Sequence, residues 1–263
     1  MRNCVGDMAS WMKANRLQLN TSKTEVLWCS SGRRQHQIPR ESVEVDQVMV
    51  APVNQVRDLG IFIDSDVSMS THVTNTVSSC FAMLRQIRSI RRSVTRPVLQ
   101  SLVVSLVLSR LDYGNATLVG LPDRLTDRLQ SVLHAGARLI HSARKFEHVT
   151  PLLQDLHWLS IRERIDYKLA VLVFRCLHGL APSYLSNGLQ RIAEVDSRRR
   201  LRSAQTAQLV IPRTRCSTLG DRSFPVAAAR VWNSLPTSLS TSVTLSSFKI
   251  DLKSYLFARS YLV

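Results

Sequence analysis

The stretch VSSCFAMLRQIRSIRRSV, Val77 to Val94, decides the class of this fold. Its apolar side chains recur at three- and four-residue steps, which is the spacing of one face of an α-helix. The stripe consists of Val77, Cys80, Phe81, Leu84, Ile87, Arg91 and Val94. Three more arginines, Arg85, Arg88 and Arg92, fall largely outside it. The stretch therefore predicts an amphipathic helix that buries one side and presents cations on the other.

Helical patterns continue along the rest of the chain. Thr95 followed by Arg96-Pro97 predicts a new helix from about Arg96 to Leu111, apolar on most sides and hence central. The sequence GLPD at Gly120 to Asp123 begins another, with Leu125, Leu129, Val132, Leu133, Leu139 and Ile140 facing inward. Ser160 and Glu163 have the spacing of a capping box, and that helix should stop at Gly179. Two short helices close the chain, about Ser223 to Ser234 and Leu245 to Phe257.

The first 69 residues follow a different pattern. A short helix is expected within Met8 to Leu19, and Thr24 to Cys29 has the alternation of a strand. Val43 to Val50 and Val56 to Asp64 are two further strand candidates, joined by the loop APVNQ. We therefore expect a mainly α fold, a helical bundle with a small N-terminal antiparallel β piece. The expected parts are 1–69, a helical domain 70–192, and a basic linker with short helices 193–263.

The charge of the chain is strongly positive and unevenly placed. The formal net charge is +16, and 29 of the 35 cations are arginine, whose planar fork suits phosphate. Residues 1–69 carry eight cations and eight anions, whereas 70–150 nets +7 and 151–263 nets +9. A polyanionic partner, nucleic acid first, is the hypothesis that this pattern favours. An anionic membrane surface and an acidic protein stay open as alternatives.

Cysteine usage and hydropathy bear on the compartment. Five cysteines at irregular distances, with no CxxC pair, indicate reduced thiols and an intracellular protein, nuclear or cytoplasmic. The most apolar run, Val98 to Leu108, is far shorter than the roughly 20 residues that span a bilayer. No transmembrane segment and no membrane partner are expected.

Few residues offer catalytic chemistry. Nucleotidyl transfer needs carboxylates that hold two divalent ions, yet the chain contains no Asp-Asp or Asp-Glu pair. The nearest substitute is Asp64-Ser65-Asp66, which we interpret as a polar strand exit rather than a metal site. His134, His141 and His148 recur every seven residues, too far apart along one helix to share a zinc ion. No catalytic residue, metal site or cofactor is predicted for this chain.

One family resemblance covers nearly the whole chain. The segment WMKANRLQLNTSKTEVLW, Trp11 to Trp28, resembles the part that follows the catalytic carboxylates in reverse transcriptases of LINE-type, non-long-terminal-repeat retrotransposons, jockey-like ones in particular. VRDLGIFID (56–64) is similar to the hairpin that grips the primer, and SRLDYGNATLVGLP (109–122) to the thumb-side helices. GDRSFPVAAARVWNSLP (220–236) resembles a closing segment of the family.

The resemblance implies roles for particular residues. Lys23 falls on the post-catalytic lysine, as a relic when no metal-bound triphosphate is present, and Leu59 and Gly60 fall on the primer-grip turn. Arg85, Arg88, Arg91 and Arg92 would line the first thumb helix and contact phosphates. Arg198, Arg199 and Arg200, in RRRLRS, would hold nucleic acid or serve as a nuclear address, although a charged linker is the commonest fate of such runs.

The function expected from the sequence is binding rather than catalysis. The family's carboxylate motifs would precede Met1, so we expect a truncated, catalytically incompetent fragment of an RNA-directed DNA polymerase. Magnesium, which serves the intact family enzyme, would have no site here. The implied partners are an RNA/DNA primer-template duplex and a separate fingers-palm part supplied in trans. The alternative is a helical protein-interaction or scaffold module without nucleic-acid function.

Overall fold

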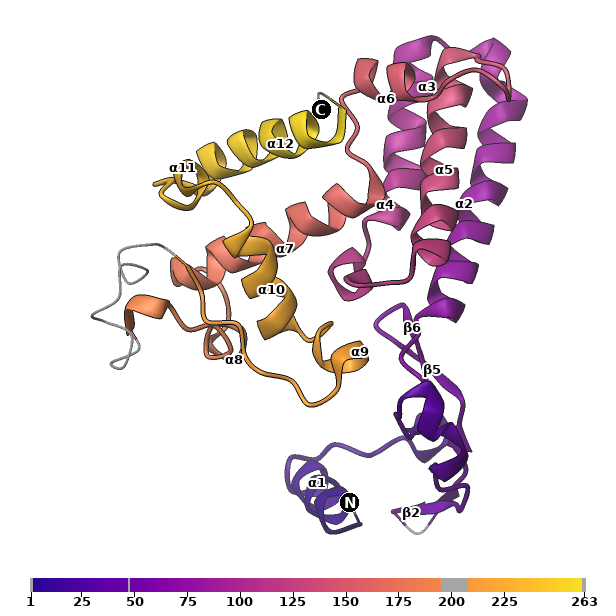
Figure 1. Cartoon of the computed structure of the whole chain (residues 1–263). Coiled ribbons are helices and arrows are strands. Elements are labelled where there is room, and N and C mark those ends of the chain that lie inside the picture. The colour runs from indigo at the N-terminus through magenta and orange to yellow at the C-terminus, as the bar shows by residue number, and fades with distance from the viewer. Residues whose placement is uncertain (1, 47, 195–207, 262–263) are drawn as a thin grey trace. The chain divides into compact units, whose positions relative to one another are not determined.

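The computed structural model describes residues 2–46, 48–194 and 208–261 (Figure 1). The chain divides into two compact units, Met1–His72 and Val73–Val263. The fold is mainly α, and the strands of the described residues all lie in the N-terminal unit. The fold class predicted from the sequence is therefore confirmed.

The N-terminal unit consists of short elements. In chain order these are α1 (Arg2–Ala14), η1 (Thr21–Lys23), β1 (Val26–Leu27), η2 (Gly32–Gln37), β2 (Val43–Val45), β3 (Val48–Val50), β4 (Pro52–Val53), β5 (Gln55–Asp58) and β6 (Ile61–Asp64). Helix α1 begins earlier and ends earlier than the sequence predicted. It ends where Asn15 Nδ2 donates to the Trp11 carbonyl over 2.8 Å and Arg16 takes a positive φ of 58°.

The strand pairing differs from the prediction in detail. The predicted strand Val43–Val50 folds back on itself as the antiparallel pair β2–β3, because Asp46 takes a left-handed φ of 47° that reverses the chain. Residues 55–64 form the antiparallel pair β5–β6, a hairpin as the family resemblance of this segment implied but alternation alone did not. The expected loop APVNQ contains β4, which pairs with β1 in parallel. Short hairpins thus replace the longer strands that alternation predicted.

The N-terminal unit has little core of its own. Val45 and Met69 are its buried apolar side chains among the described residues. Exposed apolar side chains are more numerous: Met8, Trp11, Leu17, Val48, Met49 and Leu59. Two further apolar side chains of this unit, Val26 and Trp28, are half-buried. A unit this small buries too little apolar surface to be strongly stable alone.

In the described residues of the C-terminal unit, the regular elements are all helices. Its elements are α2 (Ser70–Ile90, whose first turn lies in the N-terminal unit), η3 (Arg91–Ser93), α3 (Arg96–Val103), the π-helical segment η4 (Val104–Leu108), α4 (Ser109–Leu111), η5 (Asn115–Leu118), α5 (Asp123–His141), α6 (Thr150–Asp155), α7 (Ile161–Leu177), α8 (Ser183–Ser186), η6 (Ile192–Glu194), α9 (Ser217–Gly220), α10 (Phe224–Asn233), α11 (Thr237–Ser240) and α12 (Leu245–Tyr261).

Helices α2, α3 and α5 form a bundle (Figure 1). The predicted stripe on α2 is buried at Val77, Cys80, Leu84 and Ile87, and all six inward residues predicted for α5 are buried. Gly136 lets α5 approach α3, since a Cβ there would lie 3.2 Å from the Val103 side chain.

The helix run α3–η4–α4 corrects one expectation. Leu99, Val103, Val107, Leu108 and Leu111 are buried, but Val98, Val104 and Leu106 on other sides are exposed. The prediction that this helix is central is therefore wrong for the side that carries Val98, Val104 and Leu106.

A second core joins α7 to the C-terminal helices. Phe174 of α7 stacks on Phe248 of α12 with ring centroids 4.6 Å apart, and Trp232 of α10 lies 5.8 Å from Phe248. The side chain of Asn233 binds both the N–H and the carbonyl of Leu209, at 2.8 and 2.9 Å. The described residues of 193–263 therefore share a core with α7, whereas the sequence suggested a separate C-terminal segment.

The start of α7 does not use the predicted capping box. The Ser160 hydroxyl bonds the Glu163 carboxylate instead of a free backbone donor. The N–H of Ile161 is satisfied from another helix, because Gln130 Oε1 of α5 accepts it over 2.9 Å. The first backbone donor of α7 is therefore satisfied by a side chain distant in the sequence, and Ser160 supplies no side-chain cap.

Candidate nucleic-acid interface

An open groove of about 630 Å³ lies between the C-terminal parts of α2 and α5. Its apolar lining comes from Phe81, Leu84, Ala135 and Leu139. Its cations are Arg85, Arg88, Arg91, Arg138, Arg144 and Lys145. We call this surface, defined by those six cations, the arginine groove.

The first wall of the arginine groove follows from the pattern of α2. Arg85 and Arg88 stand next to the buried Leu84 and Ile87, so they leave the core face and remain exposed. Arg91 follows in η3, directly after α2 ends. Cations near a helix C-terminus are favoured by the helix dipole, which offsets part of their mutual repulsion. Three of the four arginines that the sequence assigned to this helix thus come together.

The second wall comes from the end of α5 and the loop after it. Arg138 lies in the last turn of α5, and Ser142 ends that helix with a φ of 57°. Arg138 Nη2 donates to the Glu147 carbonyl over 3.2 Å, and its Nε is buried with no hydrogen-bond partner. The backbone N–H of Arg144 donates to Glu147 Oε1 over 2.8 Å. These bonds hold the loop that carries Arg144 and Lys145.

The charges of the arginine groove are unbalanced. No carboxylate lines it, and among the described residues none forms an ion pair with its six cations. Other arginines of the unit are paired, as Arg96 is with Asp155 and Arg259 is with Asp166, each over 2.6 Å. Like charges gathered without counter-charges raise the local positive potential. The groove therefore favours a ligand with several negative charges.

Three groove residues were missed by sequence reasoning. Arg138, Arg144 and Lys145 lie about fifty residues beyond α2 in the chain, and folding brings the two segments together. The available signal was the basic ending of the helix 123–141 and the sequence ARK that follows it. That signal identified the cations but did not show that they lie next to Arg85, Arg88 and Arg91 in the fold.

The other predicted site residues lie elsewhere. Arg92 is exposed and does not line the groove. Lys23, Leu59 and Gly60 belong to the N-terminal unit. Arg198, Arg199 and Arg200 fall outside the described residues. Of the predicted nucleic-acid-binding residues, the arginine groove brings together Arg85, Arg88 and Arg91.

Leu59 and Gly60 form the turn of the β5–β6 hairpin. Both have positive φ, 45° and 86°, as the two central residues of a type I′ turn require. Leucine rarely adopts this conformation, and the Leu59 side chain is 83% exposed. Backbone strain of this kind tends to occur at functional positions.

Lys23 and the nearby carboxylates have local structural roles. Lys23 is exposed at the end of η1, where its N–H donates to Asn20 Oδ1 over 3.2 Å. Asp64 Oδ2 accepts from the Thr71 N–H and the Ser68 hydroxyl, and Asp66 Oδ1 accepts from the Ser68 N–H. These carboxylates hold the start of α2, as the interpretation of a polar strand exit expected. Among the described residues, no group of three or more His, Cys, Asp or Glu side chains is placed to hold a metal ion.

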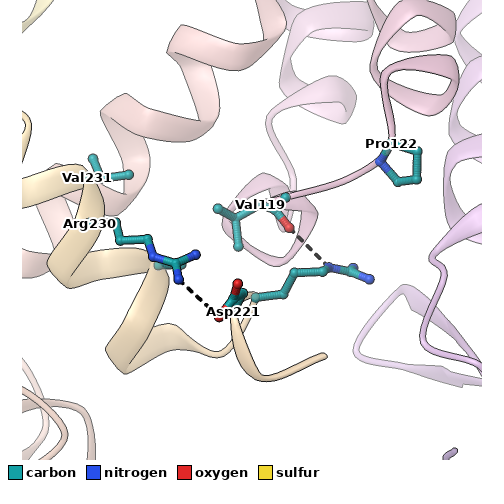
Figure 2. A pocket seen from close by; sticks show the side chains of 8 residues that line it. Val119, Pro122, Asp221, Arg230 and Val231 are labelled. Atoms are coloured by element: carbon teal, nitrogen blue, oxygen red, sulfur yellow. Dashed lines mark hydrogen bonds and ion pairs between the residues drawn. The ribbon is translucent and has the colours of Figure 1, made fainter. Parts of the chain in front are cut away.

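A second pocket, of about 460 Å³, lies beside α10 (Figure 2). Asp221 and Arg230 face each other across it in an ion pair of 3.0 Å. Arg222 Nε donates to the Val119 carbonyl over 3.1 Å, and Thr214 donates to Asp221 over 3.0 Å. The bond from Arg222 to Val119 ties the segment before α10 to the segment before α5.

Comparisons with known proteins give no relative: no family model, no curated protein and no solved structure matches the chain. Within the described residues, no helix is long and apolar enough to cross a membrane.

Proposed function

We propose that the arginine groove binds the phosphate backbone of nucleic acid. The observation that carries this proposal is the set of six cations on two walls with no acidic partner among the described residues. Guanidinium groups bind phosphate oxygens with two parallel N–H donors and keep their charge at any physiological pH. Such contacts position a nucleic acid without selecting its sequence.

The distribution of the cations favours a polymer over a small anion. One phosphate engages one or two guanidinium groups, whereas this groove offers five arginines and a lysine along two segments. A chain of phosphates matches such a row of sites. Binding would release the counterions that the nucleic acid carries, which adds favourable entropy.

We further propose that the chain descends from a LINE-type reverse transcriptase and that its partner is a primer-template duplex. Support comes from the sequence resemblance, from the exposed Leu59 at the turn of the segment similar to the primer grip, and from the helical unit that carries the arginine groove. This proposal assigns the chain a holding role. Lys23 is a relic in it, and no step of nucleotide transfer is assigned.

Binding of a fluorescent duplex, followed by anisotropy at low salt, tests the groove. The triple variant R85Q/R88Q/R91Q should bind at least about tenfold more weakly than the unmodified chain, because it removes three phosphate contacts. The matched control R124Q/R213Q/R215Q removes three exposed arginines outside the groove and lowers the net charge equally. Equal losses in both variants would show diffuse attraction and would contradict a specific groove.

A protein-interaction module is the second candidate function. Val98, Val104 and Leu106 are exposed on the run α3–η4–α4, and exposed apolar side chains are typical of protein contacts. A chain used in this way would lose little affinity for its partner as salt rises. Weak duplex binding that both triple variants leave unchanged would favour this candidate.

A further inference from the structure

We infer that Phe146 is a stacking platform for an unpaired nucleobase at the edge of the arginine groove. The inference rests on the proposed function and specifies the ligand: nucleic acid with a single-stranded stretch next to the part whose phosphates the groove holds. The juxtaposition that carries it is an exposed ring directly after two groove cations, Arg144 and Lys145.

Phe146 is exposed to an unusual degree. Its side chain is 92% exposed, the highest value among the large apolar side chains of the described residues. A single exposed apolar residue is common on protein surfaces and needs no explanation by itself. Phe146, however, lies beside cations that form no ion pair in the described part of the chain. A nucleotide can therefore stack its base on the ring and place its phosphate against the cations.

The ring is held by a structured turn. The N–H of Glu147 donates to the Arg144 carbonyl over 3.2 Å, which closes a β-turn with Lys145 and Phe146 at its two central positions. The Arg144 N–H donates to Glu147 Oε1, and Arg138 Nη2 donates to the Glu147 carbonyl. The first bond closes the turn on itself, and the second ties it to α5. A base that stacks on Phe146 would meet a ring whose backbone is already ordered, so little entropy is lost in ordering it.

The chemistry around the ring suits a nucleotide. The Lys145 ammonium lies 6.0 Å from the Phe146 ring centroid, at the limit of a cation–π contact. In the proposed complex, this ammonium binds the phosphate of the nucleotide whose base covers the ring. Every base has an aromatic face, so stacking of this kind accepts any sequence. Bases inside a duplex already stack on each other, so the ring would take one from a single-stranded overhang.

Three ligands and two variants test the inference with the full chain. The ligands are a short blunt duplex, the same duplex with a single-stranded overhang, and that duplex with abasic residues in the overhang. The overhang with bases should bind at least about fivefold more tightly than the abasic one, since base–aromatic stacking contributes that much. F146A should abolish this difference, and F146W should retain it. The blunt duplex should bind the unmodified chain and F146A equally.

Tyr184 supplies the matched control, because it is an aromatic side chain 75% exposed on α8 and outside the groove. Y184A should keep the preference for bases over abasic residues. An F146A variant that retains that preference would overturn the inference, as would equal losses by F146A on all three ligands. The inference can fail alone: blunt duplex binding that depends on Arg85, Arg88 and Arg91 would then still support the groove. Failure to bind any of the three ligands would count against the proposed function as well.

Discussion

Gln130 of α5 accepts the backbone N–H of Ile161, the first residue of α7, with an N···O distance of 2.9 Å. The Nε2 atoms of Gln130 and His134 are 2.8 Å apart. An amide nitrogen can only donate, so His134 Nε2 accepts and its proton resides on Nδ1. One glutamine thus satisfies the start of α7 and requires a neutral histidine on α5.

The variant Q130A should destabilise the C-terminal unit by about 1–3 kcal/mol, because the Ile161 N–H loses its acceptor in a half-buried place. Q130E keeps an oxygen acceptor and should lose less. S160A should also lose less, since the Ser160 hydroxyl bonds the Glu163 side chain and caps no backbone donor. Urea unfolding followed by circular dichroism measures all three. A larger loss of stability in S160A than in Q130A would show that Ser160 caps α7 after all, as the sequence predicted.

Stability should fall as the pH drops through the histidine range. Burial lowers the pKa of His134 and of His141 below the ordinary 6.5; nearby Arg138 and Arg96 act in the same direction, and Asp155 opposes them at His141. A lowered pKa in the folded state means that stability is full above pH 6.5 and is lost as the pH falls through the native pKa.

Urea unfolding midpoints at about pH 7.5 and about pH 5 measure this loss. The double variant H134Q/H141Q should show a smaller change between the two pH values than the unmodified chain. The same change in both proteins would assign the acid sensitivity to other groups.

Arg91 and Arg92 are neighbours in η3, yet the groove is lined by Arg91 alone of the two. R91Q should weaken duplex binding and make the slope of log affinity against log salt less negative by roughly one unit, because one phosphate contact is removed. R92Q carries the same change of charge and should have a smaller effect on both quantities. The reverse order would mean that the phosphates run along the other side of η3.

Leu59 holds a left-handed backbone conformation that asparagine tolerates better. L59N should therefore stabilise the β5–β6 hairpin by roughly 0.5–1 kcal/mol, seen as slower hydrogen exchange of its paired amides. If the exposed leucine contacts the nucleic acid, as the resemblance to the primer grip implies, L59N should lower duplex affinity while the hairpin becomes more stable. Unchanged affinity would remove Leu59 from the proposed interface.

The sequence predicted those parts of the fold that depend on local periodicity. The inward face of α5 and the stripe on α2 follow from apolar spacing, which burial of one helix face imposes directly. The sequence predicted that a small β piece is present, but it did not predict which strands pair. Apolar and polar residues alternate in a long strand and in each arm of a hairpin alike. This pattern therefore did not reveal that the chain reverses direction at Asp46.

Features that depend on distant residues could not be predicted in this way. Gln130 accepts the N–H of Ile161 from 31 positions away in the chain, and no short-range sequence pattern predicts such a contact. Arg85, Arg88 and Arg91 were found because they share one helix. Arg138, Arg144 and Lys145 joined them through the packing of the bundle, and so the groove as a whole is a tertiary feature.

The salt dependence of duplex binding by the unmodified chain tests the central claim most directly. Affinity should be measured by anisotropy at several salt concentrations and plotted as log affinity against log salt. Three to six phosphate contacts in the arginine groove predict a straight line with a slope between about −3 and about −5. A slope near zero, or no binding at low salt, would contradict the claim that these cations hold a nucleic-acid backbone.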